Sequence, residues 1–338
     1  MDRGKLALLA CESGLPFAQR IAQALRVILK QEHGTDDFDL SRSEEVWFAN
    51  GEVKSVIDDN IRGDDVYVVQ NVFNPQGART LNDNLLAACT LIDAARESDA
   101  DSVTAVLPVF AYARQERRKA REGITARLVV EMLEAAGADR VITLDIHAEA
   151  IAGFFRQARL ENLHASRILI DYFRNAYPTS DLVVAAPDVG SAGRARFFSR
   201  VLGTDLALID KSRSERQIHC IEGMRLVGNV TGKNVLVADD MIDTGGTLIR
   251  ACELLKDSGS REIFLATALP FFSAGAADRF DAAHRRGLFR RLLGTDAVNH
   301  GSAFAEAHPW YEEVSVAPLF ARVIFNINTK HSVSELLR

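Results

Sequence analysis

Residues 235–247 read Val-Leu-Val-Ala-Asp-Asp-Met-Ile-Asp-Thr-Gly-Gly-Thr, and apolar residues at helical spacing follow them. The apolar start predicts a buried strand, which leads into a turn rich in carboxylates and glycines. Adjacent glycines let the backbone curl tightly, so successive N–H groups at a helix N-terminus can bind a phosphate. An ordinary capped helix start would explain three carboxylates beside such a turn poorly. The stretch therefore indicates a strand–turn–helix unit that binds a phosphorylated ligand.

The polar side chains of this stretch suit a sugar that carries the phosphate. Thr244 and Thr247 supply hydroxyl donors to the phosphate oxygens. Asp239 and Asp240 stand at the end of the strand, where their oxygens could accept hydrogen bonds from sugar hydroxyls. The predicted binding residues of this loop are Asp239, Asp240, Asp243, Thr244, Gly245, Gly246 and Thr247.

Short apolar runs alternate with longer helical patterns along nearly the whole chain. Continuous apolar strands separated by helices are typical of parallel sheets covered on both faces, so we expect an α/β fold. Ligands of such folds bind at the carboxyl ends of the strands. The expected strands are Lys5–Ala10, Val66–Val72, Val103–Pro108, Arg140–Asp145, Leu182–Ala186, Leu206–Ile209, Asn234–Ala238 and Ile263–Ala268, with helices at Leu81–Ala95, Ile124–Ala136, Arg194–Leu202 and Thr247–Asp257.

Length and composition limit the classes of protein that fit. A chain of 338 residues suits two domains, and we expect a boundary near residues 157–162, giving domains 1–160 and 161–338. The net charge of −6 argues against a general nucleic-acid binder. The four scattered cysteines form no Cys-x-x-Cys pair, which favours a reducing compartment. No apolar run approaches the roughly 18 residues that cross a bilayer, so we expect a cytoplasmic protein.

Four further polar stretches are candidates for binding. Residues 112–119 read Tyr-Ala-Arg-Gln-Glu-Arg-Arg-Lys after an expected strand, where Arg can bind phosphates bidentately. Residues 143–148 read Thr-Leu-Asp-Ile-His-Ala, and residues 186–194 read Ala-Pro-Asp-Val-Gly-Ser-Ala-Gly-Arg. Residues 208–213 read Leu-Ile-Asp-Lys-Ser-Arg. Taken singly, a solvated basic turn explains the first stretch equally well. A lone histidine after a strand is more often structural than a ligand, and plain surface loops that bear Lys and Arg, as in the last stretch, are frequent.

Together these stretches resemble a known family. The loop at residues 239–247 resembles the phosphoribosyl-pyrophosphate loop of the type I phosphoribosyltransferase-like fold, which binds a ribose 5-phosphate moiety. With Phe-Ala-Asn-Gly-Glu at residues 48–52, the motifs resemble those of ribose-phosphate diphosphokinases over nearly the entire chain. The resemblance implies two phosphoribosyltransferase-like domains, each a mainly parallel sheet flanked by helices. The first domain would serve ATP and the second ribose 5-phosphate.

The resemblance also implies roles for individual residues. Lys211 and Arg213 match catalytic positions of a flexible loop. The metal would be Mg²⁺, near His147 and Asp188. Ser191 stands where the family most often has glycine, and its hydroxyl could donate to phosphate. The ATP-binding set is Phe48, Asn50, Glu52, Arg114, Gln115 and His147, and the diphosphate loop is Asp188, Gly190, Ser191 and Arg194.

The implied reaction moves the diphosphate of Mg·ATP onto the anomeric hydroxyl of ribose 5-phosphate, giving phosphoribosyl pyrophosphate and AMP for nucleotide biosynthesis. In the family, the hairpin at residues 48–52 reaches a neighbouring subunit's site, which implies a dimer and, typically, a hexamer. Two alternatives stay open. A phosphoribosyltransferase would share residues 239–247 without requiring residues 48–52. A regulatory subunit would keep the fold, although the presence of Lys211 and Arg213 argues against it.

The chain departs from the common family pattern in places that bear on regulation. Residues 269–270 are Leu-Pro where His-Pro is frequent, and residues 294–297 lack a second threonine. Ser332-Val-Ser334 still resembles the phosphate-contacting tail of the family's regulatory site. Residues 281–310 mix arginines and histidines irregularly, and we interpret them as a solvated surface segment.

Overall fold

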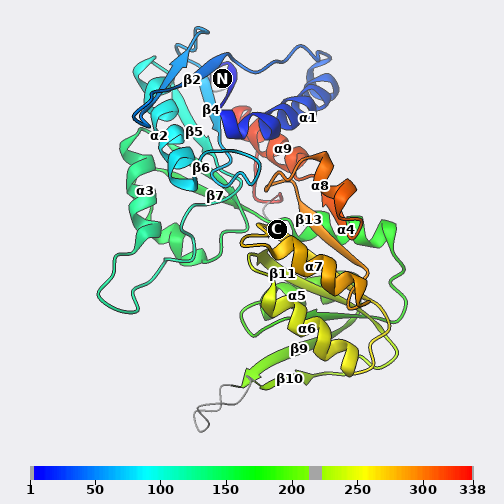
Figure 1. Ribbon diagram of the computed structural model, residues 1–338. Coiled ribbons are helices and arrows are strands. Elements are labelled where there is room, and N and C mark those ends of the chain that lie inside the picture. The colour runs from blue at the N-terminus through cyan, green and yellow to red at the C-terminus, as the bar shows by residue number, and fades with distance from the viewer. Residues whose placement is uncertain (1–3, 213–222, 337–338) are drawn as a thin grey trace. The chain divides into compact units, whose positions relative to one another are not determined.

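A computed structural model describes residues 4–212 and 223–336 (Figure 1). The chain divides into two compact units. The first takes in the chain up to His164, residues 296–299 and the segment from Ser315 onward, and the second takes in residues 165–295 and 300–314. This differs from the expected division in the C-terminal segment, which belongs to the first unit because its last helix packs there.

The first unit contains a five-stranded sheet in the order β1-β4-β5-β6-β7, and all neighbouring strands are parallel. A separate antiparallel hairpin pairs β2 with β3. The strands are β1 (Leu6–Ala10), β2 (Ser43–Trp47), β3 (Val53–Ile57), β4 (Asp65–Val69), β5 (Ser102–Val106), β6 (Arg140–Leu144) and β7 (Arg159–Leu163), and the helices are α1 (Leu15–His33), α2 (Leu81–Glu97), α3 (Thr125–Ala135) and α9 (Ala317–Asn328), with 3-10 turns at Glu12–Gly14 and Glu149–Phe154.

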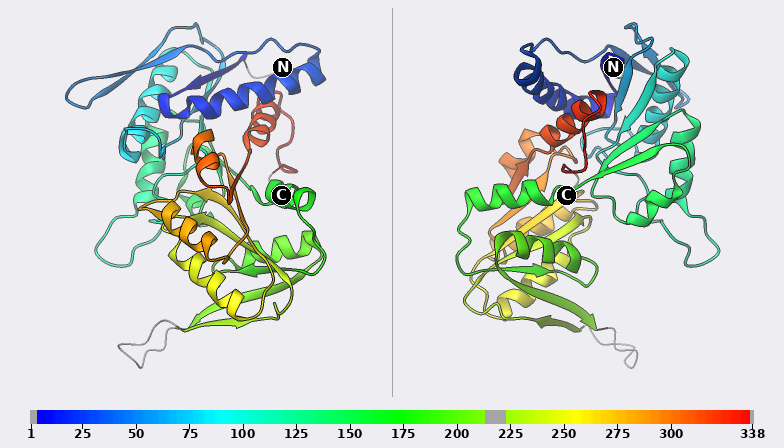
Figure 2. Two further views of the ribbon diagram at one scale, coloured as in Figure 1. Left: turned by 45° about the vertical axis from the view of Figure 1, so that its right-hand side comes forward. Right: turned by 180° about the vertical axis from the view of Figure 1, so that it is seen from behind.

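Helix α9 joins the first unit through its contacts with α1. Phe320 packs edge-on against Phe17, with ring centroids 5.2 Å apart. Arg322 donates to Glu32 at 3.0 Å. Figure 2 shows the two helices side by side. Segments from opposite ends of the sequence therefore share one core, which local periodicity cannot reveal.

The second unit contains a seven-stranded sheet in the order β10-β9-β8-β11-β12-β13-β14, parallel except for the β9–β10 pair. Alternate residues of its strands face helices on both sides. Leu265 packs in a cluster with residues of α6 and α7, whereas Phe264 meets Phe173 of α4 at 5.3 Å. The elements are β8 (Leu182–Ala186), β9 (Asp205–Ser212), β10 (Gly223–Val227), β11 (Asn234–Ile242), β12 (Ile263–Pro270), β13 (Arg291–Thr295), β14 (Tyr311–Val314), α4 (Ser166–Ala176), α5 (Ala192–Leu202), α6 (Gly246–Asp257), α7 (Ala276–Arg285) and α8 (Ser302–Ala307).

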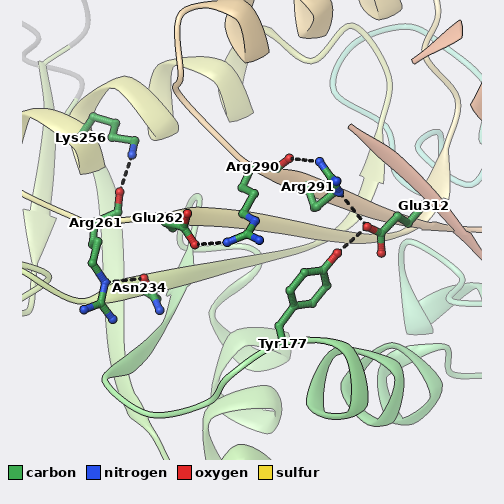
Figure 3. A network of polar contacts seen from close by, with 8 residues as sticks. All are labelled: Tyr177, Asn234, Lys256, Arg261, Glu262, Arg290, Arg291 and Glu312. Carbon is green, nitrogen blue, oxygen red and sulfur yellow. Dashed lines mark hydrogen bonds and ion pairs between the residues drawn. The ribbon is translucent and has the colours of Figure 1, made fainter. Parts of the chain in front are cut away.

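A network of polar contacts ties together the amino ends of β12, β13 and β14 (Figure 3). Arg290 donates to Glu262 at 2.7 Å, and Arg291 donates to Glu312 at 2.9 Å. Glu312 also accepts a hydrogen bond from the Tyr177 hydroxyl. These charged side chains pair with one another, so the network has a structural role. It lies at the edge of the sheet opposite the carboxyl ends of the strands.

The interpretation of residues 281–310 as a solvated segment is wrong. Strand β13 lies within it, and Leu292 and Leu293 are fully buried. Trp310 is also buried and packs edge-on against Phe272 at 5.6 Å. The arginines at the start of the strand disguised it, because charged residues suggest a surface segment, whereas Arg290 and Arg291 form ion pairs at the amino end of β13.

In the described parts of the chain, none of the helices combines the length and the apolar character needed to cross a membrane.

Candidate active site

The loop after β11 is held in a tight turn at the start of α6. Gly245, at the N-cap of α6, has φ +75°. A Cβ atom on Gly245 would lie 2.4 Å from Phe280 Cε2, so the turn needs glycine both for its backbone and for this close approach. From α7, Arg279 donates to the Thr244 carbonyl at 2.8 and 3.1 Å. The predicted strand–turn–helix unit is confirmed, and α7 supports it.

Asp239 lies where two loops meet. Strands β8 and β11 are parallel neighbours, so their carboxyl ends share one edge of the sheet. The Ser191 hydroxyl donates to Asp239 Oδ1 at 2.7 Å, and the Ser191 main-chain N–H donates to Asp188 Oδ1 at 3.0 Å. The Asp240 N–H donates to the same Asp239 oxygen at 3.0 Å. The structure thus brings the predicted diphosphate loop next to the predicted ribose 5-phosphate loop.

The electrostatics of this edge favour a cationic or hydroxyl-bearing ligand. Burial, followed by the neighbouring charge of Asp240, raises the pKa of Asp239 to about 7, although the Ser191 hydrogen bond opposes the rise. Carboxylates gathered in a half-buried place repel one another unless donors or cations compensate them. A ligand that brings hydroxyl groups or a metal ion would relieve this repulsion.

Arg194 and Lys211, two further predicted residues of the second unit, lie on α5 and β9. Arg194 lies in α5, where it donates to Ser166 Oγ at 3.2 Å. Lys211 lies in β9, with its backbone opposite Met224 of β10. Arg213 lies outside the described residues. Of the remaining predicted residues, the exposed ones are Gly190 and Thr244, and the half-buried ones are Asp243, Gly246 and Thr247.

In the first unit, the predicted residues Arg114, Gln115 and His147 follow the neighbouring strands β5 and β6 and are exposed. The backbone bends sharply before each group, because Tyr112 has φ 58° and Asp145 has φ 44°. A left-handed conformation costs a residue other than glycine roughly 1–2 kcal/mol. Both bends therefore need support from the surrounding structure.

Strand β7 provides that support for the His147 loop. Asn162 Oδ1 accepts a hydrogen bond from the Ile146 N–H at 2.9 Å. His164 Nδ1 lies 3.2 Å from Asp145 Oδ1. These contacts join the His147 loop to β7. The sequence of β7 contains no functional motif, so sequence reasoning missed both supporting residues, Asn162 and His164.

Residues 48–52, which carry three of the predicted ATP-binding residues, form the tip of the β2–β3 hairpin. The Phe48 side chain is 48% exposed, and Asn50 and Glu52 are also exposed. The Phe48 N–H donates to the Glu52 carbonyl at 2.9 Å, and Asn50 Oδ1 accepts from the Glu52 N–H at 3.2 Å. The Asn50 side chain therefore shapes the turn, a role that does not depend on a ligand.

Trp47 anchors this hairpin, a contribution that sequence reasoning also missed. The guanidinium carbon of Arg79 lies 4.0 Å from the centroid of the Trp47 ring. Glu45 accepts a hydrogen bond from Trp47 Nε1 at 3.1 Å and another from the Glu12 N–H at 2.8 Å. In the sequence, the only indication of this contact was the aromatic residue Trp47 immediately before residues 48–52.

Comparisons with known proteins place these loops in a family. Residues 6–137 match the model of the N-terminal domain of ribose phosphate pyrophosphokinase, and residues 156–291 match a phosphoribosyl transferase domain. A ribose-phosphate pyrophosphokinase of Chlorobaculum tepidum is 39% identical over 290 residues, covering 86% of this chain and 85% of the relative. Ribose-phosphate pyrophosphokinase 1 of Streptococcus pneumoniae serotype 4 is 34% identical, covering 99% of this chain and 98% of the relative.

The chain belongs to the ribose-phosphate pyrophosphokinase family.

A solved structure agrees with this assignment. The phosphoribosylpyrophosphate synthetase of Mycobacterium smegmatis superposes with a TM-score of 0.83 and 32% identity, covering 96% of this chain and 98% of the other. The α/β fold with two phosphoribosyltransferase-like domains, inferred from the sequence, is thereby confirmed.

Proposed function

We propose that this chain transfers the diphosphate of Mg·ATP to the anomeric hydroxyl of ribose 5-phosphate, giving phosphoribosyl pyrophosphate and AMP. Its membership of the ribose-phosphate pyrophosphokinase family supports this reaction. The observation that carries the proposal is the meeting of Asp188 and Asp239 across Ser191, beside the glycine turn that opens α6. This edge offers both a phosphate cradle and acceptors for sugar hydroxyls.

The second unit would bind ribose 5-phosphate. The turn at Gly245 and Gly246 starts a helix, so its main-chain N–H groups are available to the 5-phosphate and the helix dipole favours the negative charge. Asp243, Thr244 and Thr247 would complete the cradle. Asp239 and Asp240 would accept hydrogen bonds from the ribose hydroxyls, which need acceptors in a half-buried setting.

The transfer would proceed by in-line displacement. The anomeric oxygen forms a bond to the β-phosphorus, the bond from that phosphorus to the bridging α–β oxygen breaks, and AMP leaves with the electron pair. The proton of the attacking hydroxyl is released as the new bond forms. Such transfers depend mainly on positioning and on neutralising oxygen charge. We assign that neutralisation to Lys211 and Arg213, with Arg114 on the nucleotide side.

A magnesium ion fits the residues present. In the described part of the chain, no group of three or more His, Cys, Asp or Glu side chains could hold a metal ion. Mg²⁺ is typically bound through one or two carboxylates together with substrate phosphates, so it needs no such cage. Asp188 would supply a carboxylate and His147 would contact the nucleotide complex. When bound, the ion would neutralise charge on the diphosphate oxygens.

The first unit would bind ATP. Phe48 presents an exposed ring for stacking on adenine, with Asn50 and Glu52 beside it. Arg114 and Gln115 would contact the phosphates. Phe48 is 48% exposed, so its ring is accessible for stacking. On the family resemblance of this hairpin we also propose a homo-oligomer, at least a dimer, with a hexamer as the expected assembly.

The test mixes purified protein with Mg·ATP and ribose 5-phosphate and measures AMP and phosphoribosyl pyrophosphate. We expect both products in equal amounts, and we expect both to require each substrate and magnesium. Release of ADP would contradict the proposal. So would absence of product from folded protein supplied with phosphate, which would favour a regulatory subunit.

A further inference from the structure

The Ser191 hydroxyl lies between the carboxylates of two loops. Its oxygen is 2.7 Å from Asp239 Oδ1 and 3.2 Å from Asp188 Oδ1. A serine hydroxyl has one proton to donate, and the shorter distance assigns that proton to Asp239. Asp188 already receives the Ser191 main-chain N–H at 3.0 Å. The residue therefore makes one hydrogen bond to each loop, one through its side chain and one through its backbone.

Helix capping does not explain this arrangement. Ser191 occupies the N-cap of α5, where a serine hydroxyl ordinarily accepts a hydrogen bond from an N–H of the first turn. No such side-chain bond forms here. The hydroxyl is directed instead toward acids at the ends of β8 and β11, so its loss should not weaken the start of the helix.

The orientation of Asp239 depends on this contact. Its Oδ1 atom accepts from the Ser191 hydroxyl and from the Asp240 N–H at 3.0 Å, and its Oδ2 atom receives neither bond. The two donors fix the plane of the carboxylate and direct Oδ2 away from them. The Asp240 donor belongs to the same chain segment, whereas Ser191 comes from the neighbouring loop. Ser191 is thus a contact that holds one loop against the other.

We propose that Ser191 is a positioning residue that couples the two loops, holding Asp239 in the orientation that receives a pentose hydroxyl, and that its hydroxyl is not a phosphate ligand. The inference rests on the proposed function, because it assigns the loop after β11 to ribose 5-phosphate. It differs from the sequence-based expectation, in which the hydroxyl donates to phosphate. A hydroxyl with a single proton cannot serve Asp239 and a phosphate oxygen together.

The test compares Ser191→Ala, which removes the hydroxyl, with Ser191→Thr, which keeps it. The KM for each substrate and kcat come from AMP formation, and the Kd for ribose 5-phosphate comes from calorimetry without nucleotide. For Ser191→Ala we expect KM and Kd for ribose 5-phosphate to rise about tenfold, as for loss of a hydrogen bond to a charged group. The KM for ATP and kcat should change less than threefold. Ser191→Thr should restore ribose 5-phosphate binding to within threefold of the wild type.

Ser199→Ala is the matched control, because Ser199 lies in the same helix and its hydroxyl bonds the Thr204 carbonyl at 2.6 Å, away from the acids. It should leave both KM values unchanged. A rise in the KM for ATP with unchanged ribose 5-phosphate binding in Ser191→Ala would overturn the inference and make the hydroxyl a phosphate ligand. Product formation with every Ser191→Ala constant unchanged would overturn it too, leaving the proposed function intact. A wild-type chain that neither binds ribose 5-phosphate nor forms product would overturn both.

Discussion

Two predicted site loops of the second unit are hydrogen-bonded to one another, whereas the predicted site loops of the first unit are supported by other segments and carry exposed side chains. Asp188, Ser191 and Asp239 are half-buried and linked by hydrogen bonds across two loops. Phe48 and Arg114 are exposed, on separate loops of the first unit. The difference follows from chemistry. Neighbouring carboxylates need donors that hold them against their repulsion, whereas an exposed aromatic ring needs no polar partner. The proposed pentose side therefore has a hydrogen bond between its loops, and the proposed nucleotide side presents exposed side chains.

The largest effect should come from Lys211→Ala in the second unit. A cation that meets the transferring phosphates in the transition state contributes about 10³–10⁵ in rate. We expect kcat to fall at least 10³-fold while calorimetric ribose 5-phosphate binding stays unchanged. Lys233→Ala is the control, since Lys233 pairs with Asp205 at 2.8 Å on the partly exposed surface. A loss smaller than tenfold in Lys211→Ala would remove the lysine from the catalytic machinery.

Preorganisation of the pentose side can be broken with Gly245→Ala. The new Cβ would meet Phe280 at 2.4 Å on a backbone with φ +75°. We expect stability to fall by about 2 kcal/mol from strain and collision together, measured by urea denaturation. Gly246→Ala is the matched control, because a Cβ there meets nothing within 4 Å. Equal stability of the two variants would show that the turn does not depend on this close approach.

The exposed side can be tested with Phe48→Ala. The ring is 48% exposed, so its removal should leave the denaturation midpoint unchanged. Loss of stacking on a base should raise the KM for ATP about tenfold. Leu128→Ala removes another exposed apolar side chain of the same unit, 53% exposed, and should change neither quantity. An unchanged KM for ATP in Phe48→Ala would exclude the hairpin tip from the nucleotide site.

The smallest effect on stability is expected from Asp281, which lies in α7 of the second unit, outside the loops after β8 and β11. Burial alone would raise the pKa of Asp281, but hydrogen bonds from Trp310 and His308 outweigh it and hold the pKa below its usual range. A lowered folded-state pKa adds stability above the unfolded value of about 3.9, and this stability is lost as pH falls below it. Asp281→Asn should therefore cost about 0.5–1 kcal/mol at pH 6 and progressively less below about pH 4 in denaturation curves. A difference that does not vary with pH would contradict the assigned cause.

The sequence predicted the strands well where apolar runs were continuous. Leu182–Ala186 matches β8 residue for residue, and the other expected strands differ from the observed ones by a few residues at their ends. The expected strands did not include β2, β3, β7, β10, β13 and β14. Strand β13 was missed because its leading arginines look like a surface segment when their partners Glu262 and Glu312 are unknown. Pairing across strands carries no local signal in the sequence.

In the candidate site, too, the sequence predicted some residues and missed others. The residues predicted to contact a ligand could be recognised in the sequence as dense polar stretches after apolar runs. The residues that support them could not be recognised in this way. Arg279 and Asn162 bond to segments distant in the chain, and the Trp47 ring stacks on a distant arginine. The bond from Ser191 to Asp239 joins residues 48 positions apart. No periodicity relates such positions.

The sequence alone determined that this chain alternates buried strands with helices and that glycines, acids and threonines follow one strand, where we expect a sugar phosphate to bind. These properties follow from local apolar periodicity and from the backbone freedom of glycine, both of which are written in consecutive residues. Tertiary structure alone decided that α9 packs on α1, that β13 is buried, and that the Ser191 hydroxyl is directed to Asp239. Those outcomes depend on which strands lie side by side, because neighbouring strands bring together carboxyl ends that are far apart in the sequence.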